Sequence, residues 1–295
     1  MFEGVSVALV TPFRNGGVDE PALRRLIRYV LDQGVDGLVM TGSTGEAATM
    51  SRAERERVWT IAREEVKGGA FLIAGTGSNA TAETIETTKA AAQCGVDGCL
   101  VVAPYYNKPQ PRGLVAHFTA VAEASTVPIM LYNVPSRTSV NVLPETVIEA
   151  AQHPRIVAIK EASGSIEQST DILRRSSITV VSGDDALALP LAAVGAKGVV
   201  SVAGHLVGSE LVEMLKLHRS GKVEEAAALH RRLSGIFRAI FVETNPAPIK
   251  AALARLGVIE GELRSPLAAA SKETLALLET EMAALGLEPA AVNQR

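Results

Sequence analysis

The feature that most constrains the fold of this chain is a short run of consecutive apolar residues. It recurs eight times, each time followed by a turn and a longer segment with helical spacing. Runs of consecutive Val, Ile and Leu are typical of parallel strands that are buried on both faces of a sheet. They cover residues 5–10, 37–40, 71–74, 99–102, 129–132, 156–160, 179–181 and 198–202. Eight β/α units predict a closed (β/α)8 TIM barrel, with an open doubly wound sheet as the competing architecture.

The segments between these runs predict helices, which cover residues 20–33, 52–66, 82–93, 113–124, 144–152, 166–175, 185–194 and 206–220. Ser51, Thr81 and Ser165 are predicted to cap three of them, each with a polar residue three positions on.

The pattern changes after the eighth unit. Helices are predicted over 222–242, 247–256 and 266–285, with no strand between them. We therefore expect a catalytic barrel over residues 1–221 and a C-terminal helical domain over residues 222–295.

The composition narrows the classes of function. Apolar residues make up 47% of the chain and charged residues 21%, as in an ordinary globular protein. The formal net charge of −3 offers no field for nucleic acid or anionic lipid, so neither partner is expected. The first ten residues lack a cationic signal segment, and no apolar run approaches the roughly 20 residues of a membrane span. With only two cysteines, which suit a reducing compartment, we expect a cytoplasmic protein.

Lys160 is the candidate nucleophile, because it directly ends the sixth apolar run. Catalytic groups of a TIM barrel lie at the C-terminal ends of its strands. Burial among apolar neighbours lowers the pKa of a lysine from about 10.4 and leaves a neutral amine that can attack a carbonyl. The alternative is a structural ion pair between Lys160 and Glu161, and position alone weighs the two evenly.

Aromatic and cationic residues follow the neighbouring runs. Tyr132 ends the fifth run, while Tyr105 and Tyr106 follow the fourth. A phenol beside the lysine can move the protons that imine formation needs, although packing around the barrel rim is the alternative. Arg137 lies in the loop after Tyr132, and its planar guanidinium suits a substrate carboxylate, unless it is only a solvated surface cation.

Two glycine-rich turns and the spacing of the histidines indicate which ligands the chain can bind. The turn Gly42-Ser-Thr-Gly45-Glu46 offers hydroxyls and backbone N–H groups that can hold a carboxylate or relay a proton, although such turns are more often structural. The turn Gly75-Thr-Gly77-Ser-Asn-Ala80 fits a dinucleotide fingerprint. The acidic residue about 20 positions on, Asp97, precedes the next strand, so it could not reach a ribose and we expect no nucleotide cofactor. The histidines are scattered without metal-ligand spacing, so no metal site is expected.

Five motifs together resemble the dihydrodipicolinate synthase/N-acetylneuraminate lyase family, in order and spacing along nearly the whole chain. They are Gly42-Ser-Thr-Gly-Glu46, Pro104-Tyr-Tyr-Asn107, Tyr132-Asn-Val-Pro-Ser-Arg-Thr138, Ile159-Lys-Glu-Ala162 and Ser182-Gly-Asp-Asp185. The resemblance implies a TIM-barrel lyase with a class I aldolase-type mechanism that needs no cofactor. Lys160 would form an imine with pyruvate, and the derived enamine would add to an aldehyde.

The pattern around Arg137 favours the branch that uses aspartate 4-semialdehyde in lysine and diaminopimelate biosynthesis. The close alternative is a related aldolase acting on a sugar acid or hydroxy-oxoglutarate. From other classes, a nicotinamide dehydrogenase and a non-catalytic barrel remain as alternatives. A non-catalytic barrel would leave unexplained why one face of the predicted barrel holds all of the residues Lys160, Tyr132, Tyr106, Thr44 and Arg137.

The resemblance also assigns roles to single residues. Lys160 matches the Schiff-base lysine, Tyr132 the general acid/base and Thr44 the hydroxyl that links the tyrosines. Tyr106 matches a tyrosine contributed by a neighbouring subunit of a homotetramer built as a dimer of dimers, so a dimer would be the minimum active unit. Positions that bind substrate are matched by Ser43, Thr44, Arg137, Gly183 and Val200; Ser43 stands where the family often has threonine.

A regulatory pocket for lysine is implied by the same resemblance. Its positions are matched by Ala47, Ala48, Arg52, Arg55, Asn79, Glu83 and Tyr105. Lysine-sensitive members tend to carry a small hydroxyl residue at the position of Ala47 and a neutral ring near Arg52 and Arg55.

We predict weak or absent inhibition by lysine, because Arg52 and Arg55 add two cations that repel its ammonium group. A titration of turnover with lysine checks this, and half-inhibition at submillimolar lysine would contradict it.

Overall fold

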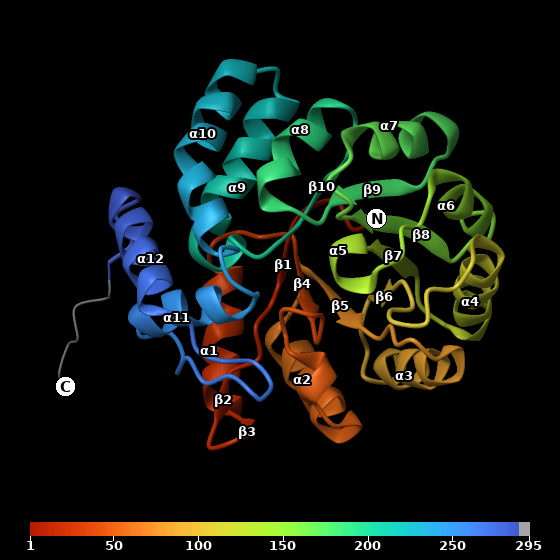
Figure 1. Cartoon of the computed structure of the whole chain (residues 1–295), viewed down its shortest axis with the longest axis horizontal. Helices are drawn as coiled ribbons and strands as arrows, with labels where there is room; N and C mark the ends of the chain where they lie inside the picture. The colour runs from red at the N-terminus through yellow and green to blue at the C-terminus, as the bar shows by residue number, and fades with distance from the viewer. Residues whose placement is uncertain (289–295) are drawn as a thin grey trace.

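Eight parallel strands close into a barrel that is surrounded by helices (Figure 1). This computed structural model describes residues 1–288. The strands are β1 (Gly4–Ala8), β4 (Gly37–Met40), β5 (Phe71–Gly75), β6 (Gly98–Val102), β7 (Ile129–Asn133), β8 (Ile156–Glu161), β9 (Thr179–Ser182) and β10 (Gly198–Ser201). Each pairs with the next barrel strand along the chain, and β10 pairs with β1. The predicted TIM barrel is confirmed, and the open doubly wound sheet is wrong.

A helix follows each barrel strand, and three more helices follow the eighth unit. The barrel helices are α1 (Glu20–Leu31), α2 (Arg52–Glu65), α3 (Thr81–Gln93), α4 (Pro111–Ala124), α6 (Pro144–Ala150), α7 (Ile166–Arg175), α8 (Ala188–Ala193) and α9 (Gly204–Arg219). The later ones, α10 (Val223–Ala239), α11 (Ala247–Arg255) and α12 (Lys272–Ala284), lie together on one side of the barrel (Figure 1). Short elements that the sequence did not predict are β2 (Phe13–Arg14), β3 (Gly17–Val18), η1 (Ala47–Thr49) and α5 (Pro135–Thr138). The short helix η2 (Asp185–Leu187) and α8 both lie within the helix predicted over residues 185–194.

Two of the three predicted N-caps are confirmed. Ser51 and Glu54 form a full capping box at the start of α2, and Ser165 accepts a backbone hydrogen bond at the start of α7. The prediction for Thr81 is wrong, because this residue is the first of α3. Its hydroxyl instead pairs with Nδ1 of His117 at 2.9 Å.

The last helix is shorter than predicted. It begins at Lys272 because Ser271 caps its N-terminus, and the backbone N–H of Ser271 donates to Glu243 at 3.1 Å. The predicted C-terminal domain extends to residue 295, and its residues 289–295 lie outside the described part of the chain. The division after residue 221 stays a prediction.

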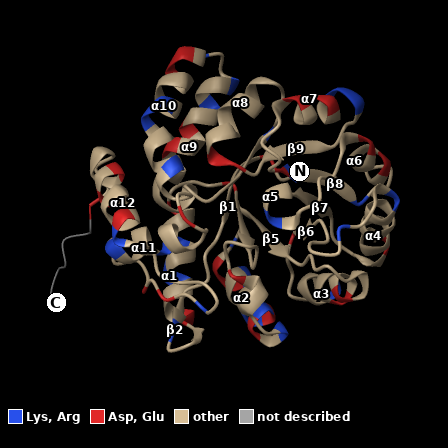
Figure 2. Cartoon of the chain, viewed as in Figure 1, with Lys and Arg blue, Asp and Glu red and all other residues tan. Residues whose placement is uncertain are grey.

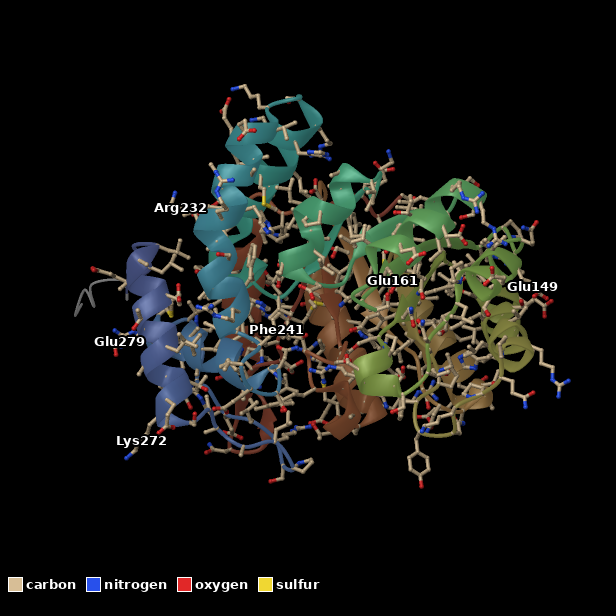
Figure 3. The ribbon with its side chains drawn as sticks, turned by 45° about the horizontal axis from the view of Figure 1, so that its top comes forward. Glu149, Glu161, Arg232, Phe241, Lys272 and Glu279 are labelled. Atoms are coloured by element: carbon tan, nitrogen blue, oxygen red, sulfur yellow. The ribbon has the colours of Figure 1, made fainter. Side chains whose placement is uncertain are left out.

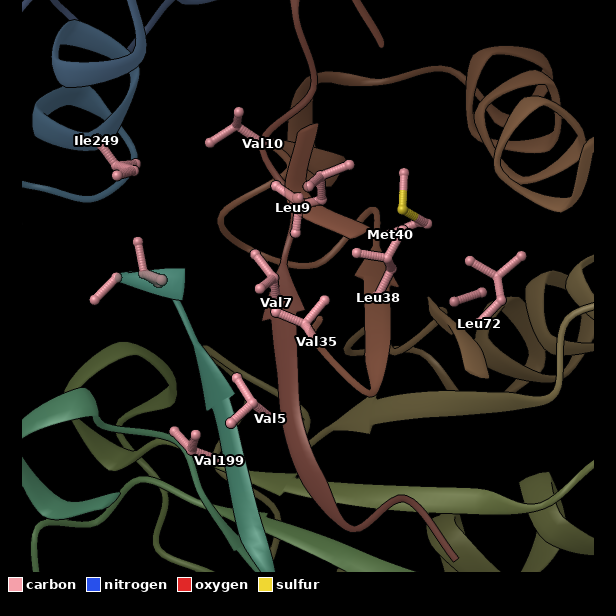
Figure 4. Packing of buried hydrophobic residues seen from close by; sticks show 14 of the residues in the cluster. Val5, Val7, Leu9, Val10, Val35, Leu38, Met40, Leu72, Val199 and Ile249 are labelled. Carbon is pink, nitrogen blue, oxygen red and sulfur yellow. The ribbon is translucent and has the colours of Figure 1, made fainter. Parts of the chain in front are cut away.

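Alternate residues along the strands belong to two separate apolar clusters. The outer cluster fills the space between barrel and helices, and Figure 4 shows Val5 and Leu38 of this cluster on β1 and β4. The inner cluster, which includes Val39 and Ala158, fills the barrel. This two-residue period decides which side chains can reach the interior of the barrel.

The glycines of the turn that fits a dinucleotide fingerprint have a packing role. A Cβ atom on Gly75 would lie 2.4 Å from the carbonyl oxygen of Thr41, and one on Gly77 would lie 2.4 Å from the backbone nitrogen of Val102. Both separations are far below van der Waals contact, so no larger residue fits without backbone movement. Close packing at the C-terminal ends of neighbouring strands therefore explains these glycines.

Charged residues of both signs are interspersed along the helices (Figure 2). Among residues 1–288, no helix has the length and apolar content needed to cross a membrane. Over the same residues, no group of three or more His, Cys, Asp or Glu side chains is placed to hold a metal ion.

A fully buried ion pair ties α11 to the loop after β4. Nζ of Lys250 donates to Oε1 of Glu46, and both side chains are 0% exposed. Oε2 of Glu46 accepts the backbone N–H of Arg264 at 3.0 Å, and Lys250 also donates to the carbonyl of Glu262 at 2.8 Å. The Lys250 ammonium lies 4.3 Å from the centroid of the Phe13 ring. These contacts stabilise two charges that would be costly to bury alone.

We expect Lys250→Met to lower the free energy of unfolding by about 3–5 kcal/mol, because Glu46 would stay buried without its cation. Chemical denaturation measures the loss. The Glu46→Gln/Lys250→Met double variant should recover much of it, since a neutral amide needs no cation. Equal losses in the single and double variants would contradict this account.

Candidate active site

Lys160 and Tyr132 face each other inside the barrel, at the C-terminal ends of β8 and β7. They are register partners on adjoining strands, and alternation places them on the same face as the inner-cluster residues Ala158 and Met130. Nζ of Lys160 lies 4.4 Å from the centroid of the Tyr132 ring. Both side chains are buried, with 5% and 8% exposed. An amine and a phenol thus meet where both side chains are largely shielded from solvent.

Burial has opposite effects on these two groups. It lowers the pKa of Lys160 to about 8, an effect that the Asp185 carboxylate opposes and the Arg137 guanidinium reinforces. It raises the pKa of Tyr132 to about 12, with Arg137 acting in the opposite direction. Near neutral pH part of the Lys160 population is therefore a free amine, while Tyr132 keeps its proton. This pair supplies a nucleophile and a proton donor side by side.

Glu161 does not pair with Lys160. As the next residue on β8 it projects to the other face of the strand. Figure 3 labels Glu161 among the side chains of the chain. Its carboxylate accepts hydrogen bonds from the side chain of Asn133 at 3.1 Å, the backbone N–H of Ser163 at 2.7 Å and the side chain of Gln168 at 3.0 Å. The ion-pair alternative for Lys160 is therefore wrong, and Glu161 instead holds the loop that follows the lysine.

A cavity of about 890 Å³ opens above Lys160. Phe241, beyond the end of α10, and Asn245 line it from the C-terminal part of the chain. Six of the predicted site residues line the same cavity: Ser43, Thr44, Tyr132, Arg137, Lys160 and Gly183.

Gly183 leaves room for the lysine side chain. A Cβ atom at this position would lie 3.0 Å from Cε of Lys160 and 2.7 Å from Cβ of Ala162. Any larger residue would therefore displace the lysine or the loop after β8.

Two predicted residues lie elsewhere. Val200 is 1% exposed within the inner cluster and does not line the cavity. Tyr106 is 88% exposed, in a left-handed backbone conformation (φ 73°) after β6, and it does not line the cavity of its own chain.

The loop after β4 presents Thr44 to the cavity. Thr44 is 4% exposed, and its Oγ1 accepts a hydrogen bond from Nδ2 of Asn245 at 2.8 Å. Nη2 of Arg137 donates to the backbone carbonyl of Asn245 at 3.2 Å. One residue from the C-terminal part of the chain therefore contacts two predicted site residues.

A second cavity, of about 440 Å³, adjoins the first. Five of the residues predicted for the regulatory pocket line it: Ala47, Ala48, Arg55, Glu83 and Tyr105. Arg52 and Asn79 do not line it: Arg52 pairs with Glu56 at 2.8 Å, and the Asn79 carbonyl accepts from Asn107 at 2.8 Å.

Two site residues escaped the sequence analysis. Asp185 is 2% exposed and accepts the backbone N–H groups of Val202 and Ala203, at 3.1 and 3.0 Å, so it holds the loop after β10. Its place in the Ser182–Asp185 motif was the available signal. Asn245 had none, since it lies in a loop between two helices far along the chain from the residues that it contacts.

Known proteins share both the sequence and the architecture of this chain. The model of the dihydrodipicolinate synthetase family matches residues 1–285. This chain belongs to that family. It is 46% identical over 289 residues to the 4-hydroxy-tetrahydrodipicolinate synthase of Pelobacter propionicus, covering 97% of this chain and 100% of the relative.

Solved structures of the family superimpose closely. A dihydrodipicolinate synthase from Aquifex aeolicus has a TM-score of 0.96 at 41% identity, with 98% of this chain and 100% of that one covered. The enzyme from Cyanidioschyzon merolae, solved with lysine bound, has a TM-score of 0.95 at 44% identity, with 97% and 99% covered. The resemblance inferred from the motifs is confirmed.

Lys160→Met should raise the free energy of unfolding at pH 7 by up to about 3 kcal/mol, because burial lowers the lysine pKa from 10.5 to about 8 in the folded state. In the unfolded chain Lys160 stays protonated up to about pH 10.5. Below that pH, folding either buries the ammonium or removes its proton, and both cost free energy. The gain should be constant below pH 8 and should disappear as the pH rises from 8 to 10.5.

Denaturation at pH 7 and above pH 10.5 measures the gain. Lys197→Met, which replaces an exposed lysine, is the matched control and should change little. A Lys160→Met variant no more stable than the parent at pH 7 would show that this ammonium is not destabilising.

Proposed function

We propose that this chain is a 4-hydroxy-tetrahydrodipicolinate synthase, which condenses pyruvate with L-aspartate 4-semialdehyde in diaminopimelate and lysine biosynthesis. The observation that carries the proposal is the buried Lys160 amine, with its pKa lowered to about 8, beside Tyr132 at the mouth of the barrel. The family membership supports it, and so do relatives of that name that are 44–48% identical over most of the chain.

In the proposed mechanism the neutral amine of Lys160 attacks the keto carbon of pyruvate. The carbinolamine loses water to give an imine, and loss of a methyl proton gives an enamine. The enamine forms a carbon–carbon bond to the aldehyde carbon of the semialdehyde. The amino group of that substrate then attacks the imine carbon, which closes the ring and frees Lys160. Tyr132 is the general acid/base for these proton transfers, and no step requires a cofactor.

Polar groups around the cavity have matching roles in the proposal. Ser43 and Thr44 bind the pyruvate carboxylate, and Arg137 binds the carboxylate of the semialdehyde through its planar guanidinium. Gly183 keeps space for the lysine and its adduct, while Val200 is a buried member of the inner cluster of the barrel.

We also propose a cytoplasmic homotetramer, arranged as a dimer of dimers, in which Tyr106 enters the site of a neighbouring subunit. The 88% exposure of Tyr106 and its absence from the cavity lining of its own chain support this role. The Thr44 hydroxyl would link Tyr106 to Tyr132. A chain of this kind would need a partner before its proton relay is complete.

The proposal of weak lysine regulation now depends on fewer residues. Arg55 lines the second cavity, whereas Arg52 is paired with Glu56 outside it. Of the two arginines predicted for this pocket, only Arg55 would therefore oppose lysine binding there, together with the apolar Ala47.

A borohydride reagent with pyruvate should trap a covalent adduct on Lys160, and Lys160→Ala should remain unmodified. The rate of trapping should rise with pH through about 8 and level off above it, because only the neutral amine attacks. Mass spectrometry reads the adduct, and an unmodified parent protein would refute the proposal.

The second substrate is tested by turnover. Aspartate 4-semialdehyde should be used in preference to aldehydes derived from sugar acids and to hydroxy-oxoglutarate. Arg137→Met should raise the KM for the semialdehyde by about tenfold or more, the effect of losing a charged hydrogen bond, while pyruvate adduct formation persists. Preference for another aldehyde would leave the imine chemistry intact and reassign the substrate.

A further inference from the structure

The bond between Asn245 and Thr44 joins two distant parts of the chain inside the site. Asn245 lies between α10 and α11, is 5% exposed and lines the main cavity. Its Nδ2 donates to Oγ1 of Thr44 at 2.8 Å. Its Oδ1 is buried and has no hydrogen-bond partner among residues 1–288. Within the described chain, the side chain is therefore held through Thr44 alone.

This bond restricts the Thr44 hydroxyl. A threonine hydroxyl has one proton to donate and two lone pairs that accept. Because an N–H of Asn245 occupies one lone pair, the hydroxyl proton cannot point at Asn245 and must turn elsewhere. Thr44 lines the same cavity as Tyr132 and Lys160, so this proton is free to point into that cavity.

We propose that Asn245 is a positioning residue that sets the direction of proton transfer through Thr44. The amide donates to the hydroxyl, and the hydroxyl donates toward the tyrosine side of the cavity. The proposal rests on the proposed function, in which Thr44 relays protons between tyrosines. In this proposal Asn245 acts on the reaction through Thr44.

Both partners of the bond are held by neighbouring contacts. Two residues after Thr44, Glu46 forms the buried pair with Lys250, which lies five residues after Asn245. The hydroxyl of Thr11 donates to the carbonyl of Gly45 at 2.7 Å. The amide and the hydroxyl therefore meet on two anchored segments, and loss of the amide cannot be compensated by a simple shift of either loop.

A double-mutant cycle tests the proposal. Asn245→Ala keeps the backbone carbonyl that binds Arg137 and removes the amide. It should lower kcat by about tenfold, part of the contribution of positioned proton transfer, with smaller changes in both KM values. In the Thr44→Val background, Asn245→Ala should cause no further loss in kcat or in the rate of borohydride trapping. Multiplicative losses, or an unchanged kcat in Asn245→Ala, would overturn the proposal.

Asn245→Asp tests the direction and keeps the shape of the side chain. A carboxylate only accepts, so the Thr44 proton would turn toward it and away from the tyrosines. This variant should have a kcat no higher than Asn245→Ala, and activity equal to the parent would refute the inferred direction. Asn245→Asp also tests the positioning role if Asn245→Ala fails to fold.

Asn141→Ala is the matched control. Asn141 is exposed, its side chain bonds those of Asn133 and Gln168 at 2.8 Å, and it does not line the cavity. Its kcat should equal that of the parent, and a tenfold loss there would count against a specific role for Asn245. Failure of the parent to form the pyruvate adduct would overturn the proposed function. A normal adduct with an unaffected Asn245→Ala would overturn only the positioning role.

Discussion

The two-residue period of strands in a closed barrel is the constraint on which the site depends. Because successive residues project to opposite faces, Lys160 enters the barrel while Glu161 leaves it. The same period sends Tyr132 inward from the adjoining strand, at the same level as the lysine. An amine placed in this position loses most of its hydration, and its pKa falls. The chemistry of the site therefore follows from strand geometry before any specific contact is considered.

The sequence predicts this part of the molecule well because the signals are local. Continuous apolar runs mark strands buried on both faces, and a polar residue at the end of such a run must lie at the barrel mouth. Lys160 and Tyr132 could be found in this way, and Figure 1 shows the closed barrel that brings their strands together. The role of Thr44, which lies in the turn after the second run, came from the family resemblance. Gly183 was identified through the family motif, and the closeness of the Lys160 side chain explains why no larger residue fits there.

Other features could not be predicted because they depend on packing between distant segments. Asn245 and Thr44 are 201 positions apart, and their contact exists only once α10 and α11 have docked beside the barrel. Arg52 and Arg55 look equivalent in the sequence, yet the structure turns one toward Glu56 and the other toward the second cavity. Helix periodicity predicts only approximately which face of a helix a residue lies on. The direction of a long side chain such as arginine also depends on the residue with which it pairs.

The two cavities share one wall, formed by Gly42, Ser43, Leu100, Tyr132, Val134, Arg137 and Asn245. A molecule in the smaller cavity would therefore contact residues that also border the reacting centre. Thermodynamic linkage then makes the two occupancies reciprocal: the factor by which one ligand changes the affinity of the other is the same in both directions. Such a coupling would act through the residues that both cavities share.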